Sequence, residues 1–486
     1  MAADLTSPRR LHPLTLVLGP VRILQGWAVP IVVALVLGRS DRGAFAGVGV
    51  VALVVGATVV RQVLEYLRLR WWVADSAFQM RSGILQTEVR SVPIDRVQNV
   101  DVTQPLLPRL LGIADVRIET AGAGGGDISL RSVSMDEAYA IRAALAQARV
   151  LESGEESPVQ RTLLEVGTGE LLIAGATANR IGAIAVLLGA AWGWVADLGL
   201  DPGDLIDEAE VFAGRFRVSL LVAAAVVLAV IVGWVVSIVA TILRYHGFKL
   251  TEDGGDLRRE HGLLTRATGV IPIARVQAVR IERPILRRLT RRASVVADSA
   301  GSVAASTDTG SGVVAPILRD GDVPSIVRRV LQTPDVAESP LASVNRLAIR
   351  RGFLRIAVFV VLISTAAALV EFGYGLVLVP GLACAWLWAK ARYRAIGYRV
   401  DQNLVVARSG VLTRRTWLVP TSKVQSTVVR TSPFQRRLGL ATLSLDTAGP
   451  GNHRVSVIDL DAPLAREMAV RLSGLSSQHG MASDGV

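Results

Sequence analysis

The hydropathy of the chain rises in six charge-free runs that come in three close pairs. A membrane-spanning helix needs roughly 20 mostly apolar residues, and the shorter runs reach that length with flanking arginines whose side chains extend to the interface. A buried core helix is the alternative for any single run, but the pairing of the runs favours membrane helices. The pattern therefore predicts six transmembrane helices in three pairs. The runs cover residues 23–38, 43–60, 181–196, 218–243, 356–370 and 372–389.

A long polar region follows each pair of runs, and the three regions repeat the same landmarks. The segments VPIDRVQNVDVTQP (92–105), IPIARVQAVRIERP (271–284) and VPTSKVQSTVVRTSP (419–433) share two prolines and a basic residue followed by Val-Gln. In all three, one glycine stands 10 residues before the first proline and another 29 residues after it. Landmarks that keep two fixed spacings in three copies indicate triplication of one unit. They are Gly83, Pro93 and Gly122, then Gly262, Pro272 and Gly301, then Gly410, Pro420 and Gly449.

Each unit is predicted to be mainly β. Alternating apolar and polar residues around glycine turns indicate antiparallel strands. After the second proline, the segments QPLLPRLLG, RPILRRLTR and SPFQRRLGL each predict one short helical turn, and two further strands follow. An amphipathic helix closes each unit, at 134–149, 323–332 and 463–474. The sequence therefore predicts a small barrel-like β domain with a helix at its C-terminal end.

The pattern VPIDRVQNV…PLLPRLLGIADVRIETAG resembles the bacterial pleckstrin-homology (PH) domain of the YdbS/YdbT-like membrane proteins. Three such units, each after paired spans, resemble the larger, YdbT-like members, and the resemblance covers nearly the whole chain. It implies a PH-like fold, which is a bent, partly open antiparallel barrel closed at one end by a helix. It implies little about function, because a PH-like barrel serves many binding roles. The expected fold class is a membrane α + β protein in which each transmembrane pair precedes a PH-like domain.

The same landmarks set the expected domain boundaries. The second unit departs most from the pattern, because TEDGGDLRREHG adds polar residues, RRLTRR replaces the helix-ending glycine and SAGSVAASTDTGSGVV forms a long hairpin. If one unit has lost or changed its ligand, we expect it to be this one. The expected segments are a cytoplasmic N-terminal segment (1–19), transmembrane helices 1 and 2 (20–64), PH-like domain 1 (65–152), transmembrane helices 3 and 4 with an acidic external loop (178–243), PH-like domain 2 (244–334), transmembrane helices 5 and 6 (353–391), PH-like domain 3 (392–475) and a disordered tail (476–486).

The placement of charge sets the expected orientation. Hydrophobic residues make up 51% of the chain and charged residues 19%, and the net charge is +12. Arginines crowd the membrane-proximal ends of the three polar regions, whereas the connector at 197–210 is acidic. Positive residues collect on the cytoplasmic side of a membrane. We therefore expect a multi-pass protein of the bacterial plasma membrane with its N-terminus and all three PH-like domains in the cytoplasm. Topology then accounts for much of the basic charge, and no nucleic-acid partner is expected.

Basic and glutamine residues in two recurring slots form the candidate binding surface. One slot holds the basic residue and the glutamine of the Val-Gln motif, and the other holds the arginine four residues after the second proline. A basic groove suits anionic lipid headgroups or an acidic partner peptide, and each cation near an anionic leaflet contributes about 1 kcal/mol. The alternatives are that these side chains hydrogen-bond the turn backbone, or that RRLTRR is solvated charge. The slot residues are Arg96, Gln98, Arg109, Arg275, Gln277, Arg288, Lys423, Gln425 and Arg437. The neighbouring arginines Arg287, Arg291, Arg292 and Arg436 complete the candidate surface, which is densest in the second unit.

No catalytic, cofactor or metal site is predicted. The segment GAGGGD (122–127) lacks the Lys-Ser/Thr and the following helix of a phosphate loop, and the five histidines show no metal-ligand spacing. The spans carry no ionisable residue at mid-membrane, which disfavours an ion-coupled transporter. We therefore expect a non-enzymatic membrane scaffold that binds anionic lipid or a protein partner, such as a smaller PH-domain membrane protein of the same family. The alternative is a component of a transport, export or resistance system for a small hydrophobic or peptide substrate.

Overall fold

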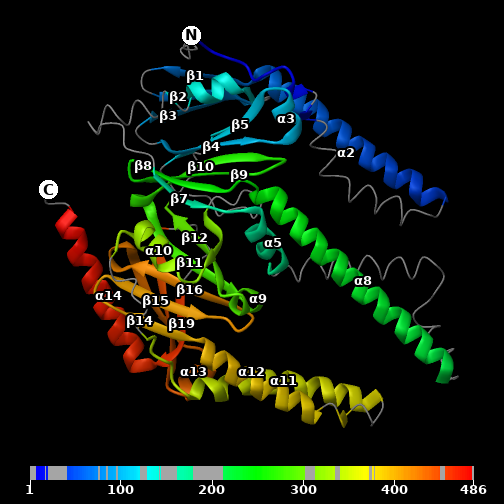
Figure 1. Ribbon diagram of the computed structural model, residues 1–486, viewed down its shortest axis with the longest axis vertical. Coiled ribbons are helices and arrows are strands. Elements are labelled where there is room, and N and C mark those ends of the chain that lie inside the picture. The colour runs from blue at the N-terminus through cyan, green and yellow to red at the C-terminus, as the bar shows by residue number, and fades with distance from the viewer. Residues whose placement is uncertain are drawn as a thin grey trace. The chain divides into compact units, whose positions relative to one another are not determined.

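The computed structural model shows the three sequence repeats as three sets of six strands (Figure 1). The predicted runs 23–38 and 181–196, the acidic connector 197–210 and the candidate Arg96 lie outside the described residues. The structure describes residues 7–16, 18–19, 41–74, 77–83, 86–94, 97–120, 128–141, 143, 161–178, 212–300, 312–333, 340–370, 375–376, 378–448 and 455–483.

In the first repeat, two antiparallel sheets contribute to one core. Trp71 and Phe78 of the first sheet are fully buried, and their rings stack with centroids 5.9 Å apart. Ile118 and Leu130 of the second sheet join the same cluster, and Ile141 adds to it from the helical residues 135–141 that follow the last strand. The elements are β1 (Arg70–Ala74), β2 (Ala77–Ser82), β3 (Glu88–Pro93), β4 (Val97–Gln104), α3 (Leu106–Leu110), β5 (Ile113–Thr120) and β6 (Ile128–Ser134).

The second and third repeats have the same order of elements. In the third repeat one cluster again joins both sheets, from Val405 and Val419 to Leu443 and Val455. Its closing helix extends to Ser483, into the stretch for which a disordered tail is expected. The elements are β8 (Lys249–Asp253), β9 (Asp256–His261), β10 (Arg266–Pro272), η3 (Ile273–Arg275), β11 (Val276–Pro284), α9 (Ile285–Leu289), β12 (Arg292–Ser299), β13 (Val313–Arg319) and α10 (Val323–Leu331), then β14 (Gly397–Val400), β15 (Leu404–Ser409), β16 (Thr413–Pro420), η5 (Thr421–Lys423), β17 (Val424–Arg430), α13 (Pro433–Arg437), β18 (Leu440–Thr447), β19 (Val455–Asp461) and α14 (Ala462–Ser483).

The landmark glycine before the first proline has a steric reason. It ends the second strand of each repeat with a positive φ, which only glycine adopts at little cost. A Cβ at this position would lie about 2 Å from the backbone oxygen three residues further on, so the turn before the third strand excludes any side chain. The three glycines are Gly83 (φ 114°), Gly262 (φ 111°) and Gly410 (φ 96°), and the distances are 1.8, 1.9 and 2.0 Å.

The Val-Gln motif also has a backbone role. It begins the fourth strand of each repeat, and the register with the fifth strand shifts directly after the valine. The glutamine is therefore the extra residue of a β-bulge, a feature that bends a strand and increases its twist. The shifts lie between Val97 and Asn99, between Val276 and Ala278, and between Val424 and Ser426.

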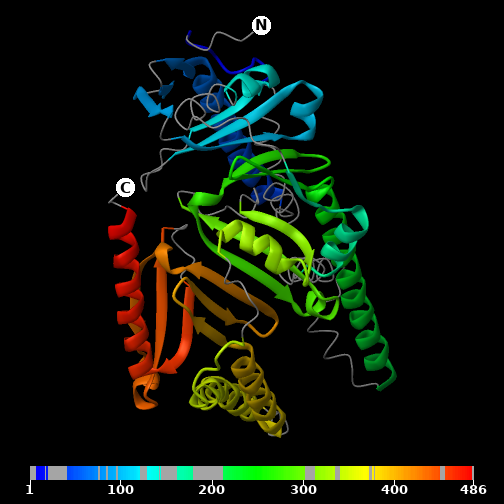
Figure 2. The same cartoon turned by 60° about the vertical axis from the view of Figure 1, so that its left-hand side comes forward.

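Successive repeats are joined by two strand pairings, here called the first and second joint. In the first joint β4 pairs antiparallel with β10, with Val102 opposite Thr268. In the second joint β11 pairs with β16, with Ile281 opposite Thr416. These residues hold equivalent positions in the repeat, so both joints use one register. The second joint can be followed in Figure 2, where the yellow-green strands of the second repeat continue into the orange strands of the third, in the order β13-β12-β11-β16-β15-β14.

Four of the six predicted membrane helices fall on long helices. Within the described residues, the segment Leu347–Leu369 is long and apolar enough to span a membrane, with a mean hydropathy of 2.2, and Val230–Tyr245 is a shorter apolar helix. The three paired spans as a set stay a prediction. Run 43–60 lies in α2 (Asp41–Arg68), run 218–243 in α8 (Phe212–Tyr245), run 356–370 in α11 (Leu347–Val370) and most of run 372–389 in α12 (Leu378–Ala395).

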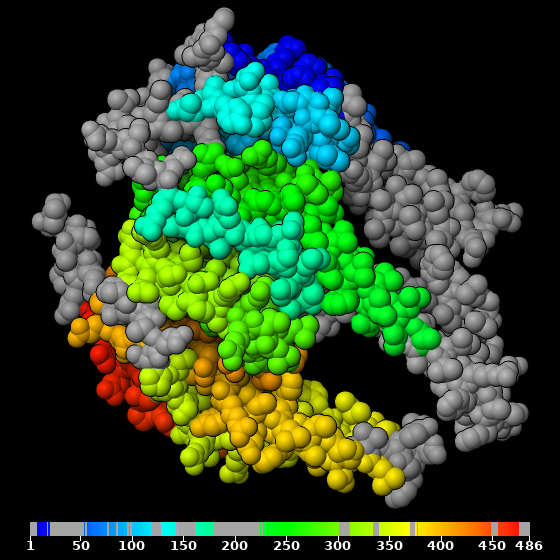
Figure 3. All heavy atoms as spheres, viewed as in Figure 1, coloured from blue at the N-terminus to red at the C-terminus, as the bar shows by residue number. Residues whose placement is uncertain are grey.

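The apolar side chains of these helices lie open rather than packed. Phe359 and Ile363 of α11 are 63% and 67% exposed, and Trp386 of α12 is 47% exposed. The space-filling view shows α8 in green and the α11–α12 pair in yellow with their side chains on the surface (Figure 3). A core helix of a soluble protein would bury such residues, and apolar faces of this extent are expected in contact with lipid.

A residue before each predicted helix pair is hydrogen-bonded to a residue after it. Backbone atoms at or beside the first strand of each repeat bond to a residue that precedes the helices. Before the second pair this segment includes β7 (Arg161–Glu165) and the helix α5 (Thr168–Ala176), elements that the sequence did not predict. The bonds run from Arg9 N to Trp71 O (2.8 Å), from Val166 N to Phe248 O (3.0 Å) and from Ala342 N to Tyr398 O (2.8 Å).

The chain forms two compact units. One comprises Met1–Arg161 with Thr251–Pro272, and the other Thr162–Leu250 with Ile273–Val486. The second repeat therefore contributes to both, with β9 and β10 in the first unit and β11 to β13 in the second. Each joint lies inside one unit.

Candidate binding surface

The Val-Gln slot makes backbone contacts in the second repeat. The side chain of Gln98 lies outside the described residues, as does Arg96. Gln277 is 7% exposed, and its Nε2 donates to the carbonyl oxygen of Arg275 at 3.1 Å. In the third repeat, Lys423 Nζ donates to the carbonyl oxygen of Ala274 at 2.9 Å, whereas Gln425 is exposed. Gln277 and Lys423 of this slot therefore bond to backbone carbonyl oxygens, whereas the side chain of Gln425 is exposed.

The second slot, which holds the arginine four residues after the second proline, makes a hydrogen bond across each joint. Arg109 Nη1 donates to Leu263 O at 3.3 Å, and Arg288 Nη2 donates to Val411 O at 2.7 Å. Both acceptors directly follow the landmark glycine of the next repeat, so one arginine makes the same contact in both joints. Arg437 holds this position in the third repeat and is exposed, like its neighbour Arg436.

The run RRLTRR separates into residues with different roles. Arg287 is 8% exposed and donates through Nη1 to Pro316 O at 3.1 Å and through Nη2 to Ala174 O, near the C-terminal end of α5, at 3.4 Å. Burial lowers the pKa of Arg287, although the nearby Glu282 opposes the shift. Arg287 therefore ties α9 to α5 instead of facing a ligand.

Arg291 takes the position of the helix-ending glycine. Its φ of 51° is close to those of Gly112 (68°) and Gly439 (65°). In all three repeats the carbonyl oxygen of this residue accepts a hydrogen bond from the backbone N–H of the residue directly after the last strand of the repeat. A non-glycine residue in this region carries about 1–2 kcal/mol of strain. Arg292 begins β12 opposite Arg319 and is half-buried.

Four arginines gather beside the second joint. Burial lowers the pKa of Arg414, and the neighbouring cations Arg408, Arg288 and Arg283 lower it further. Arg283 Nε pairs with Asp320 Oδ1 at 2.8 Å. Arg408 Nε donates at 3.3 Å to the carbonyl oxygen of Ala395, the last residue of α12. A cationic cluster at the end of a predicted membrane helix is placed where anionic headgroups lie. Only Arg288 of this cluster was a candidate from the sequence.

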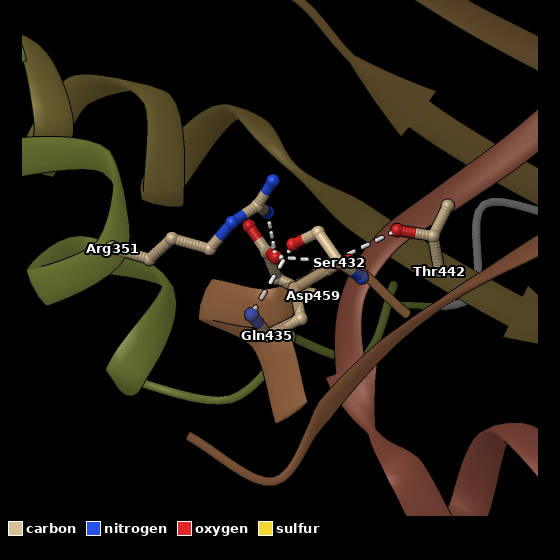
Figure 4. Close-up of polar contacts among 5 residues, drawn as sticks. All are labelled: Arg351, Ser432, Gln435, Thr442 and Asp459. Carbon is tan, nitrogen blue, oxygen red and sulfur yellow. Dashed lines mark hydrogen bonds and ion pairs between the residues drawn. The ribbon is translucent and has the colours of Figure 1, made fainter. Parts of the chain in front are cut away.

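A buried polar cluster couples the third helix pair to the third repeat (Figure 4). Asp459 of β19 has a side chain 3% exposed, and it pairs with Arg351 in the first turns of α11. Gln435 Nε2 donates to Asp459 Oδ1 at 3.0 Å and to Thr442 Oγ1 at 2.9 Å. Ser432 and Gln435 also cap α13, since each side chain accepts from the other residue's backbone N–H. Sequence patterns do not reveal this cluster, because Arg351 and Asp459 are 108 residues apart in the chain.

Among the third and fourth strands of the repeats, two lie at the end of a sheet instead of in a joint. β3 ends the sheet β1-β2-β3, and β17 ends the sheet β17-β18-β19. Val89 of β3 and Val428 of β17 are 58% and 37% exposed. Within the described residues no strand pairs with either outer edge, and such an edge is a template for another strand. Among the same residues, no group of three or more His, Cys, Asp or Glu side chains is arranged to hold a metal ion.

Comparison with known proteins agrees with the repeat structure. A family model for the bacterial PH domain matches the chain three times, at residues 28–149, 211–333 and 351–476. The chain is 22% identical over 462 residues to the UPF0699 transmembrane protein YdbT of Bacillus subtilis (strain 168), which covers 90% of this chain and 92% of that protein. No solved structure matches the chain. Three matches that together span most of the sequence establish that the chain belongs to the bacterial PH domain family, as a membrane protein with three copies of the domain.

Proposed function

We propose that the protein is a non-enzymatic scaffold of the plasma membrane that presents its three PH-like modules to the cytoplasm and binds a protein partner there. The observation that carries the proposal is the open outer edge of β17. The third repeat exposes residues whose equivalents in the second repeat are either buried or bonded to the next repeat. Gln425 and Arg437 are exposed, whereas Gln277 is 7% exposed and Arg288 is bonded to the next repeat.

The hydrogen bonds across each helix pair support a common side for the three modules. The residue before each predicted helix pair and the residue after it are hydrogen-bonded to each other, as Arg9 is to Trp71, so the pair begins and ends at the same place. Such a segment crosses the membrane an even number of times. The excess of arginine at the same ends favours the cytoplasm as that side.

The use of the basic slots favours a protein over lipid at these positions. Arg109, Arg288 and Lys423 all donate to carbonyl oxygens of a neighbouring repeat, and Arg287 is buried. Each of these four side chains already makes a contact within the protein, although Arg109 stays exposed, as do Arg291, Arg436 and Arg437. An unpaired strand edge binds extended peptide segments through backbone hydrogen bonds.

The test is capture of a partner from native membranes. The tagged full chain is produced together with an untagged copy, cross-linked in membranes and purified in mild detergent, and bound proteins, the untagged copy included, are quantified by gel electrophoresis and mass spectrometry. We expect a stoichiometric partner that Val428→Lys releases and the matched Val428→Thr retains, because lysine disfavours pairing at an edge. A chain that binds no protein, or that alone supports substrate flux in proteoliposomes, would contradict the proposal.

A second candidate function is binding of anionic lipid by the cluster of Arg283, Arg288, Arg408 and Arg414. Its specific support is the gathering of four cations, in which burial first and then the neighbouring arginines lower the pKa of Arg414 and of Arg408; a bound anion would offset this repulsion. Lipids that copurify with the wild type and with Arg408→Gln/Arg414→Gln would be compared, with Arg117→Gln as the control, since Arg117 is exposed elsewhere. Equal recovery of anionic lipid from all three would exclude this role.

A further inference from the structure

Both joints follow one rule of pairing. The fourth strand of one repeat, β4 or β11, pairs with the third strand of the next repeat, β10 or β16. Under this rule two strands lack a neighbour within the described residues: β3, a third strand, and β17, a fourth strand. A third strand and a fourth strand are the two partners that a joint requires, so β3 and β17 could supply one further joint.

The exposure of β17 fits a joint that lacks its other half. Gln277 and Ala278 at the start of β11 are 7% and 2% exposed. The equivalent residues of β17, Gln425 and Ser426, are exposed. Val428 of β17 is 37% exposed. Positions that are covered in β11, whose outer edge pairs with β16, are therefore exposed in β17.

The closing helix does not take the place of the missing strand. α14 packs against β17, and Thr427 Oγ1 donates to Ala469 O at 3.4 Å. In the second repeat α10 packs against β11 in the same way, yet β11 still pairs with β16. The helix therefore covers a face of the fourth strand and leaves its edge available.

The register of the joints brings complementary residues together. Glu282 stands opposite Arg415 in the second joint, and their side chains form an ion pair at 3.2 Å. The same register places Arg430 of β17 opposite Glu88 of β3, and Val429 opposite Val89. The charges are exchanged between the strands but remain opposite. Arg430 and Val89 are exposed, and the Glu88 side chain is 58% exposed while it pairs with Arg90 of its own strand at 2.7 Å. Val429 is half-buried against the core of the third repeat.

We propose that β17 of one molecule pairs with β3 of a second copy of the chain, in the register of the two joints. This inference deepens the proposed function, because it names the partner of the β17 edge. A second copy is the occupant that the chain itself supplies, in matching register and charge, and the expected topology puts both strands on one side of the membrane. The contact is heterologous, so it forms closed rings or open rows of molecules.

The test is a disulfide between two differently tagged copies in native membranes. Both carry Cys384→Ala, one carries Val429→Cys and the other Val89→Cys. We expect oxidation to join the two tags, and Glu88→Cys or Arg90→Cys to cross-link at least 5-fold less, because adjacent side chains of a strand point to opposite faces. The pair Ile281→Cys with Thr416→Cys in one chain calibrates the yield, because those residues face each other in the second joint.

Charge exchange gives a second readout. Arg430→Glu in one copy is expected to weaken the cross-link, and Glu88→Arg in the other to restore it. Absence of the 429–89 cross-link while the 281–416 pair forms would overturn the inference, as would a double-cysteine chain that cross-links only to itself. If Val429→Cys is captured by a different protein, the inference fails and the proposed function stands. If it is captured by nothing, both fail.

Discussion

Removing Arg351 should destabilise the third repeat far more than neutralising its partner Asp459. Arg351→Met leaves a carboxylate 3% exposed that accepts from the neutral Gln435 Nε2 at 3.0 Å and keeps Arg392 as a nearby cation. Breaking a buried ion pair in this way costs about 3–5 kcal/mol. Asp459→Asn keeps the acceptor for Gln435 and suits the φ of 66°, since asparagine tolerates the left-handed region. Arg351 is 18% exposed and can turn toward water, so we expect a cost of about 1–2 kcal/mol.

The assay is thiol labelling of a buried cysteine in the full chain. In a Cys384→Ala background, Val455→Cys places a thiol at a site 1% exposed, where labelling requires the repeat to open. Because each 1.4 kcal/mol is tenfold in an equilibrium, Arg351→Met should speed labelling about 100- to 4000-fold and Asp459→Asn about 5- to 30-fold. The double variant should resemble Asp459→Asn, because it has no buried carboxylate. Equal effects of the two single changes, or simple addition in the double variant, would refute the reasoning.

Three further predictions concern single side chains. Arg288→Met should weaken the second joint by about 1–3 kcal/mol through loss of the bond to Val411 O, and Arg288→Lys by less, as measured by pulse proteolysis; no difference from wild type would contradict this contact. Arg291→Gly should raise the unfolding free energy by about 0.5–1 kcal/mol, because relief of left-handed strain exceeds the entropy of an added glycine; a loss of stability would be the opposite of this. Burial, and to a smaller extent the charge of Asp461, raises the pKa of Tyr398 above its ordinary value. The contribution of Tyr398 to the free energy of unfolding is therefore complete below about pH 10 and is lost as the pH rises through the folded-state pKa. Tyr398→Phe should therefore flatten the alkaline loss of stability, and an unchanged slope would exclude Tyr398 as its source.

The repeated fold was predictable because its landmarks are local. A glycine that must hold φ near 100° and a glutamine in a β-bulge are short-range requirements, so both recur at fixed spacing. The succession of strands along each repeat and the short helix follow from the same signals. The family resemblance, confirmed by the three matches, then supplied the PH-like architecture.

The joints were not predictable, because nothing in a strand says whether its edge meets its own repeat or the next one. The roles within RRLTRR were hidden for a related reason. Neighbouring residues of a helix point about 100° apart, so Arg287 is buried against α5 while Arg288 reaches Val411. The sequence shows the two arginines but not which face of α9 is covered. The binding role of the candidate residues stays a prediction.

The side of the membrane on which the modules lie tests the central claim most directly. Single cysteines would replace the exposed residues Arg117, Thr290 and Glu467, one in each repeat, in a Cys384→Ala chain. A membrane-impermeant maleimide would then be applied to inside-out and right-side-out vesicles. We predict labelling of all three in inside-out vesicles and protection in right-side-out vesicles, with the reverse for a cysteine at Asp204 in the acidic connector. Labelling of any of the three repeats from the outside would contradict a scaffold whose modules share the cytoplasmic face.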